Sequence, residues 1–223
     1  MKTVLLNFIL KSSGYLFAAT ILGFTGVMII KIMPYMSFEH AINFLGTKTD
    51  AVLNKPYFQT AFYIHITSSI AVIGTGIFQF FPKILRGYPK VHMLIGKIYI
   101  GSILLFAAPS GLVIASFANG GLSSKVGFSL QCCVWFAVTY AAWHAIMQQK
   151  WEKHIEMMLR SYAVTLAAMS LRTESYALYY FFQTKPIETY LTVTWLSWVG
   201  NLCIVEILIY AGLARHLLSK YSN

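Results

Sequence analysis

Long apolar stretches separated by short polar connections make up most of the chain. Six of these stretches reach the length of about 20 residues that an α-helix needs to cross a bilayer. Their approximate limits are 14–33, 57–81, 92–117, 126–147, 154–182 and 190–213. Prolines stand mainly at the borders, where a missing N–H does least harm, but Pro109 lies inside the third stretch and predicts an irregularity there. The pattern predicts an all-α bundle of six transmembrane helices that forms one domain, 1–223.

The fifth stretch is unusual because it carries ionisable side chains among mainly apolar residues. It contains neither Gly nor Pro, so a single long helix is expected over 154–182. On such a helix His154 and Arg172 would be separated by about five turns at ~3.6 residues per turn and would share one face. Ionisable groups inside a bilayer cost free energy unless they are paired, which makes them candidates for function.

Composition supports a multi-pass membrane protein. Hydrophobic residues make up 57% of the chain and charged residues only 11%, far from an average soluble domain. The formal net charge of +10 could suggest nucleic acid, but the basic residues cluster at the ends of the apolar stretches. Membrane topology explains that charge better. The expected partner is the lipid bilayer, with no nucleic acid.

The basic residues also predict an orientation. One side of the membrane would hold Lys2, Lys11, Lys83, Arg86, Lys90, Lys150, Lys153, Arg215 and Lys220. The opposite side would hold Lys48, Lys55, Lys125 and Lys185. Because positive charge accumulates on the cytoplasmic side, both termini are expected in the cytoplasm, with the protein in the cell (inner) membrane.

Three histidines fall at one predicted level near the cytoplasmic side: His92, His144 and His154. Neutral imidazole is a common axial ligand, so this layer could bind a b-type haem. We expect His92 and His154 to be the ligands, with His144 in reserve. The alternative is that these histidines only extend from helix ends toward the membrane surface. No separate metal site is predicted.

A second polar layer is expected near the outer side. His65 and Gln79 belong to a stripe of polar and small residues at helical spacing in the second stretch, which could face Arg172. Histidine can accept a hydrogen bond from a guanidinium but cannot neutralise it. An anionic or quinone-like ligand is therefore predicted for His65, Arg172 and Gln79.

Arg160 and Glu206 should lie at similar depth on the fifth and sixth stretches. We interpret them as a buried structural ion pair that joins two helices. No Walker motif, zincin motif or Gly-rich nucleotide loop is present.

The chain resembles an uncharacterised family of predicted membrane proteins, the one called domain of unknown function 2306. The resemblance rests on His65, Phe78-Gln79-Phe80, Arg86, His92, Gly96, Tyr99, His154, Met158, Arg160-Ser161-Tyr162-Ala163 and Leu171-Arg172. It covers the second to fifth stretches and supports the six-helix interpretation. It implies no established activity.

Three functional hypotheses follow from these residues. The first is an integral-membrane redox or cofactor-binding protein, linked to haem or quinone. The second is a transporter of small solutes or ions that uses the same residues as a pathway. The third is a non-catalytic membrane helper subunit, in which the polar residues would be structural. Whether the protein is an enzyme is left open at this stage.

Overall fold

The computed structural model describes residues 2–39 and 42–222, in which the chain forms helices and connecting turns without a β-strand. The predicted all-α class is confirmed. The α-helices are α1 (Lys2–Ile32), α2 (Asp50–Leu53), α3 (Pro56–Phe78), α4 (Pro82–Gly87), α5 (Pro89–Gly101), α6 (Ala108–Ala115), α7 (Gly121–Met147), α8 (Trp151–Thr165), α9 (Ala167–Phe182), α10 (Pro186–Tyr210) and α11 (Leu213–Ser222). Short 3-10 turns η1 (Met33–Ser37) and η2 (Leu45–Thr47) and a π-helical turn η3 (Ser102–Ala107) complete the described part.

Five helical segments in the described residues are long and apolar enough to cross a membrane. They are Tyr15–Ser37, Pro56–Phe78, Pro89–Ala115, Gly121–Met147 and Pro186–Tyr210. These segments correspond to the first four predicted stretches and to the sixth. A proline lies in the first turn of the helices that begin the second, third and last segments, where its missing N–H breaks no intrahelical bond.

The fifth predicted stretch differs from expectation, because the chain turns at Leu166 and divides it into α8 and α9. The Thr165 hydroxyl donates to the Ser161 carbonyl at 3.0 Å, and such back-bonding bends helices. The Met169 N–H then pairs with the Leu166 carbonyl, three residues earlier. The prediction of one unbroken helix over 154–182 is therefore wrong. His154 and Arg172 lie on different helices and do not share a face.

The irregularity expected at Pro109 is present in a different form. The third spanning segment contains α5, the π-helical turn η3 and α6, with Pro109 in the first turn of α6. Single π-helical turns inside α-helices are uncommon and are often found at functional sites. Here the carbonyl of Ala107, at the end of this turn, accepts a hydrogen bond from His65 on α3 at 2.8 Å. The turn therefore helps to attach α3 to the third segment.

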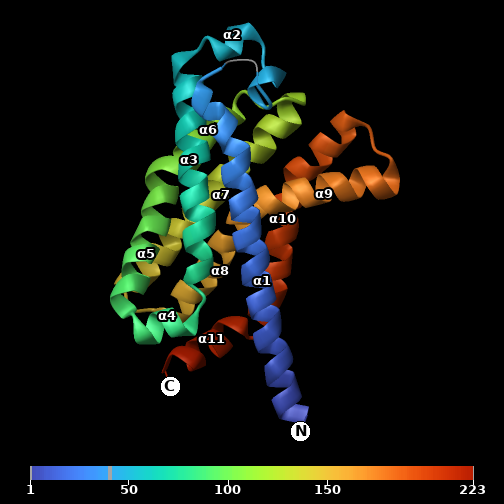
Figure 1. Cartoon of the computed structure of the whole chain (residues 1–223). Coiled ribbons are helices and arrows are strands. Elements are labelled where there is room, and N and C mark those ends of the chain that lie inside the picture. The colour runs from blue at the N-terminus through green and yellow to red at the C-terminus, as the bar shows by residue number, and fades with distance from the viewer. Residues whose placement is uncertain (1, 40–41, 223) are drawn as a thin grey trace.

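The helices form a bundle with two distinct ends (Figure 1). The start of α1, α4 and α11 lie at one end, which we call the base. The turns η1 and η2, α2 and the connection between α6 and α7 lie at the opposite end, which we call the top. Helix α8 rises from the base and packs mainly against α7 and α10. Helix α9 leaves the bundle sideways and pairs with the first half of α10, and this hairpin (residues 167–193) is called the arm.

Candidate functional site

A buried hydrogen-bond network joins α5, α7 and α8 in the middle of the bundle. The Tyr99 hydroxyl lies 2.9 Å from the hydroxyl oxygens of both Ser161 and Thr165. Ser161 lies 2.7 Å from the Thr139 hydroxyl, and the Trp135 indole N–H donates to Thr165 at 3.1 Å. Tyr99, Thr139 and Ser161 are fully buried. Polar groups buried this deeply must satisfy one another, so the network fixes the relative positions of three helices.

Two bonds to backbone carbonyls determine how the hydroxyl hydrogens of this network are used. Thr139 donates its hydrogen to the Trp135 backbone carbonyl at 2.7 Å, so Ser161 must donate to Thr139. Thr165 donates to the Ser161 backbone carbonyl, so the single Tyr99 hydroxyl hydrogen is shared between Ser161 and Thr165. The Trp135 indole N–H supplies the remaining bond, to Thr165. The network begins and ends at Trp135, and every hydroxyl hydrogen in it is donated to another group of the protein. This favours a structural role for the network.

His92 and His154 lie on the faces of α5 and α8 that carry the network, nearer to the base of the bundle. His92 precedes Tyr99 by seven residues on α5, and His154 precedes Ser161 by seven residues on α8. Seven residues are close to two helical turns, so each histidine lies below one member of the network. The two rings are within electrostatic reach of each other. The structure therefore brings together two of the three histidines predicted to share a layer.

The His154 ring is fixed by one backbone contact. Its Nδ1 lies 2.8 Å from the carbonyl oxygen of Ala142 on α7. A carbonyl can only accept, so Nδ1 carries the proton and Nε2 carries the lone pair. This tautomer is the one that ligating histidines commonly have, with the second ring nitrogen donating to a backbone carbonyl.

His92 and Gln79 carry polar atoms that the protein does not satisfy. The Nδ1 of His92 and the Nε2 of Gln79 are both buried and lack a hydrogen-bond partner among the described residues. Gly96, one turn from His92 on α5, provides the space for Gln79, because a Cβ there would lie 2.9 Å from the Gln79 Oε1. Unpaired buried polar groups are rare in native proteins. We call Gln79, His92, Gly96 and His154 the base-end site.

His144 lies apart from this pair. Its side chain is exposed near the end of α7, where its ring stacks on Tyr140 and its Nε2 contacts Gln148. Ala142, which binds His154, is buried and lies two residues away, about 200° around the helix. His144, the reserve haem ligand predicted from the sequence, therefore lies on a different face of α7 from Ala142.

The predicted outer residues do not lie together, because His65 is within α3, Gln79 caps the C-terminal end of α3, and Arg172 is on α9. His65 donates from Nδ1 to Ala107 and packs closely over Gly111, where a Cβ would lie 2.9 Å from the ring. Arg172 donates to the Ala168 carbonyl of its own helix at 2.6 Å, at the root of the arm. Gln79 lies in the base-end site. No hydrogen bond joins His65, Arg172 and Gln79 in the part of the chain that the structure describes.

Arg160 and Glu206 form an ion pair, as the sequence suggested, and the contact is bidentate. Arg160 donates from Nε and one terminal nitrogen to the two carboxylate oxygens of Glu206. A second carboxylate, that of Glu156, lies 3.5 Å from the guanidinium. The Glu206 side chain is 51% exposed, so the pair lies at the surface of the bundle, whereas the sequence suggested a buried pair.

Sequence reasoning did not predict the buried network, and it singled out neither Trp135 nor Thr139. The signal that could have found the network is the shared seven-residue spacing from His92 to Tyr99 and from His154 to Ser161. Among the described residues, no group of three or more His, Cys, Asp or Glu side chains could hold a metal ion.

The family profile of a predicted membrane protein family, DUF2306, matches residues 62–209, about two thirds of the chain. The chain belongs to this family. The matched region contains the base-end site, the buried network and the arm. No curated protein and no solved structure gives a match to the chain.

Proposed function

We propose that this DUF2306 member is an integral-membrane redox protein that binds a b-type haem through His92 and His154. The observation that supports this most is the pairing of two half-buried histidines from different helices at the base end of the bundle. One has a fixed tautomer with its Nε2 lone pair available, and the other has an unsatisfied ring nitrogen. A bound haem would supply reversible one-electron transfer between the ferrous and ferric states.

The side chains around the histidines support this proposal. His92 and His154 would be enough to hold a haem without a third protein ligand, so the lack of a three-residue metal cluster among the described residues does not bear on this proposal. The unpaired Gln79 amide is a hydrogen-bond donor for an acceptor group on the cofactor. Met158, one turn beyond His154, is buried and adds an apolar surface. Low polarity around a haem influences its reduction potential.

The buried network gives the site its rigidity in this proposal. Tyr99 and Ser161 join α5 to α8 about two turns above the histidines, so a buried hydrogen bond helps to fix the spacing of the two helices that carry the imidazoles. Gly76 on α3 permits this close packing, because a Cβ there would lie 2.7 Å from the Tyr99 ring. Ligand pairs held by rigid helices keep their geometry without help from loops.

A haem titration of the purified protein in detergent tests the proposal. We expect saturable binding of one haem, with a Soret band typical of a protein-bound haem. His92→Ala and His154→Ala should each weaken binding at least about tenfold, as expected for loss of a metal ligand. The exposed histidines His144 and His216 provide matched controls, and alanine at either position should leave binding unchanged.

Two results would contradict the proposal. The first is a wild-type protein that takes up no haem although it remains folded. The second is equal weakening by the His144 and His92 variants, which would indicate binding at the protein surface.

A further inference from the structure

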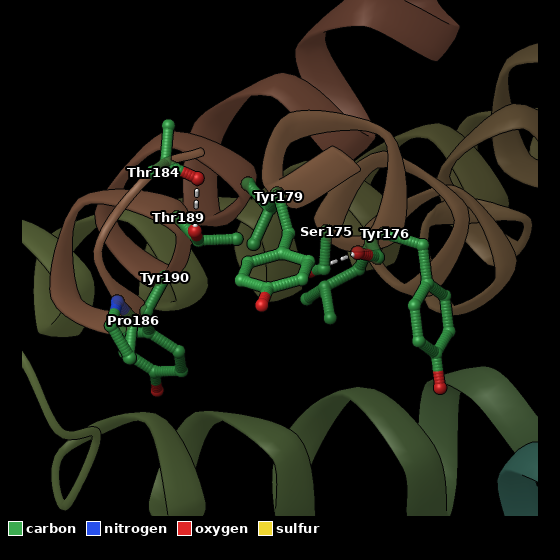
Figure 2. Close-up of a pocket in the computed structure, with 9 residues that line it drawn as sticks. Ser175, Tyr176, Tyr179, Thr184, Pro186, Thr189 and Tyr190 are labelled. Carbon is green, nitrogen blue, oxygen red and sulfur yellow. Dashed lines mark hydrogen bonds between the residues drawn. The ribbon is translucent and has the colours of Figure 1, made fainter. Parts of the chain in front are cut away.

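The arm contains a groove between α9 and α10 that the proposed function does not use. Its volume is about 340 Å³, within the range of small-ligand sites. Figure 2 shows the groove and the tyrosine side chains along it. The lining residues are Leu171, Ser175, Tyr176, Tyr179, Thr184, Pro186, Thr189, Tyr190 and Val193.

The hydroxyl groups of the smaller lining residues are already used within the protein. Ser175 donates to the Leu171 carbonyl at 2.6 Å. Thr184 and Thr189 lie 2.6 Å apart, and Thr189 also contacts the Lys185 carbonyl. The groove therefore presents mainly aromatic rings and aliphatic groups to an occupant, and no acidic or basic side chain lines it. This surface favours a hydrocarbon chain.

Arg172 places a positive charge beside this apolar groove. It follows the lining residue Leu171 and lies within electrostatic reach of Tyr176, which also lines the groove, and of Tyr35. The only hydrogen bond of its guanidinium in the described structure goes to the Ala168 carbonyl. No ion pair in the described residues neutralises it. Its remaining N–H groups are suited to a phosphate, which a guanidinium can bind with two parallel bonds.

The surroundings of the arm identify the kind of molecule that reaches it. Tyr176, Tyr179, Tyr180, Phe181 and Phe182 are each at least 64% exposed. A surface of this kind is typical of the boundary between lipid headgroups and acyl chains. Phospholipids present a phosphate and hydrocarbon side by side at this boundary.

We propose that the arm binds an anionic phospholipid, with one acyl chain in the α9–α10 groove and the phosphate on Arg172. Arg172 selects the negative headgroup and the groove selects the chain. This site is independent of the haem proposal, since it lies on the arm and shares no residue with the base-end site.

Native mass spectrometry of the full-length protein in detergent tests this site. The probes are phosphatidylglycerol and phosphatidylcholine with identical acyl chains, so that only the net headgroup charge differs. The wild type should prefer phosphatidylglycerol. Arg172→Gln should reduce that preference about fivefold, the usual effect of one basic residue near anionic lipid, while phosphatidylcholine binding stays unchanged. Arg86→Gln, at an exposed arginine of α4, is the matched control and should keep the preference.

A second pair of variants tests the groove. Tyr179→Ala removes a wall of the groove and should weaken both lipids equally. Tyr180→Ala removes a neighbouring exposed ring that does not line the groove and should have no effect. Glycerol phosphate, which has the phosphate without the chains, should not displace the lipid.

Three outcomes would overturn the proposal. One is equal loss of preference in the Arg172 and Arg86 variants, which indicates general charge attraction. Another is a wild type without headgroup preference. The last is displacement by glycerol phosphate, which indicates a phosphate site without a role for the groove. Retained phosphatidylcholine binding shows that a variant is folded, so loss of preference cannot arise from misfolding.

Discussion

At the scale of single residues, Tyr99 links the side chains of the buried polar network across two helices. Its hydroxyl touches Ser161 and Thr165, and its ring packs against Tyr162. The sequence identified His92 and His154 because ionisable residues stand out in apolar stretches. It could not identify the Ala142 carbonyl that fixes His154, because a backbone group on another helix leaves no mark in the sequence.

Removal of the Tyr99 hydroxyl should therefore destabilise the protein. In Tyr99→Phe the Ser161 and Thr165 hydroxyls lose a partner in a site that water does not reach. Unsatisfied buried groups of this kind cost about 1–3 kcal/mol. Thermal or denaturant unfolding in detergent measures the change. Tyr140→Phe, at an exposed tyrosine of α7, is the control. Equal unfolding free energies of the two variants would show that the network does not stabilise the protein.

At the scale of the elements, the sequence predicted the helices well and their breaks poorly. Hydrophobic length and border prolines located five spanning segments, since both signals are local. The turn at Leu166 escaped because no Gly or Pro marks it. Instead, Thr165 turns its hydroxyl to Ser161 and accepts the Trp135 indole N–H from α7. The bend thus depends on a contact between helices, which periodicity does not report.

The connection at the top of the bundle is held by a lysine in an unusual setting. Lys48 donates to the Phe117 carbonyl at 2.7 Å and to the Asn119 side chain at 2.9 Å. Its ammonium group lies 4.8 Å from the centre of the Phe44 ring. Burial and the nearby charge of Lys125 lower the pKa of Lys48 from 10.5 to about 8.

This pKa predicts a change of stability with pH. Between pH 8 and 10.5 the unfolded chain keeps the Lys48 proton and the folded chain loses it. The unfolded state then binds more protons, so the contribution of Lys48 to stability rises with pH in this window. Melting temperatures measured in detergent from pH 7.5 to 9.5 should rise less steeply with pH in Lys48→Met than in the wild type. Lys83→Met, at an exposed lysine of the base, should retain it. An identical slope in all three proteins would contradict the assignment.

At the scale of the whole molecule, membrane class and family follow from the sequence, and the path of the fifth stretch does not. The start of α1 and the end of α11 lie together at the base (Figure 1). Both ends are therefore expected on one side of the membrane. Lysine and arginine distribution further predicts that this side is cytoplasmic.

Cysteine labelling tests this topology. Lys125→Cys near the top and Ser219→Cys at the base would be introduced separately into a protein without its native cysteines, Cys132, Cys133 and Cys203. A reagent that does not cross the membrane should label intact cells only at position 125. Labelling at position 219 alone would indicate the opposite orientation. Labelling at both positions would indicate that the two ends of the bundle lie on one side of the membrane.

The most direct test of the central claim is the electron paramagnetic resonance spectrum of the protein after loading with ferric haem. Two axial histidines predict a low-spin spectrum for the wild type. Replacement of either His92 or His154 by alanine should convert it to a high-spin spectrum, while His144→Ala should leave it low-spin. A high-spin wild type, or a spectrum that neither the His92 nor the His154 variant alters, would contradict ligation by this pair.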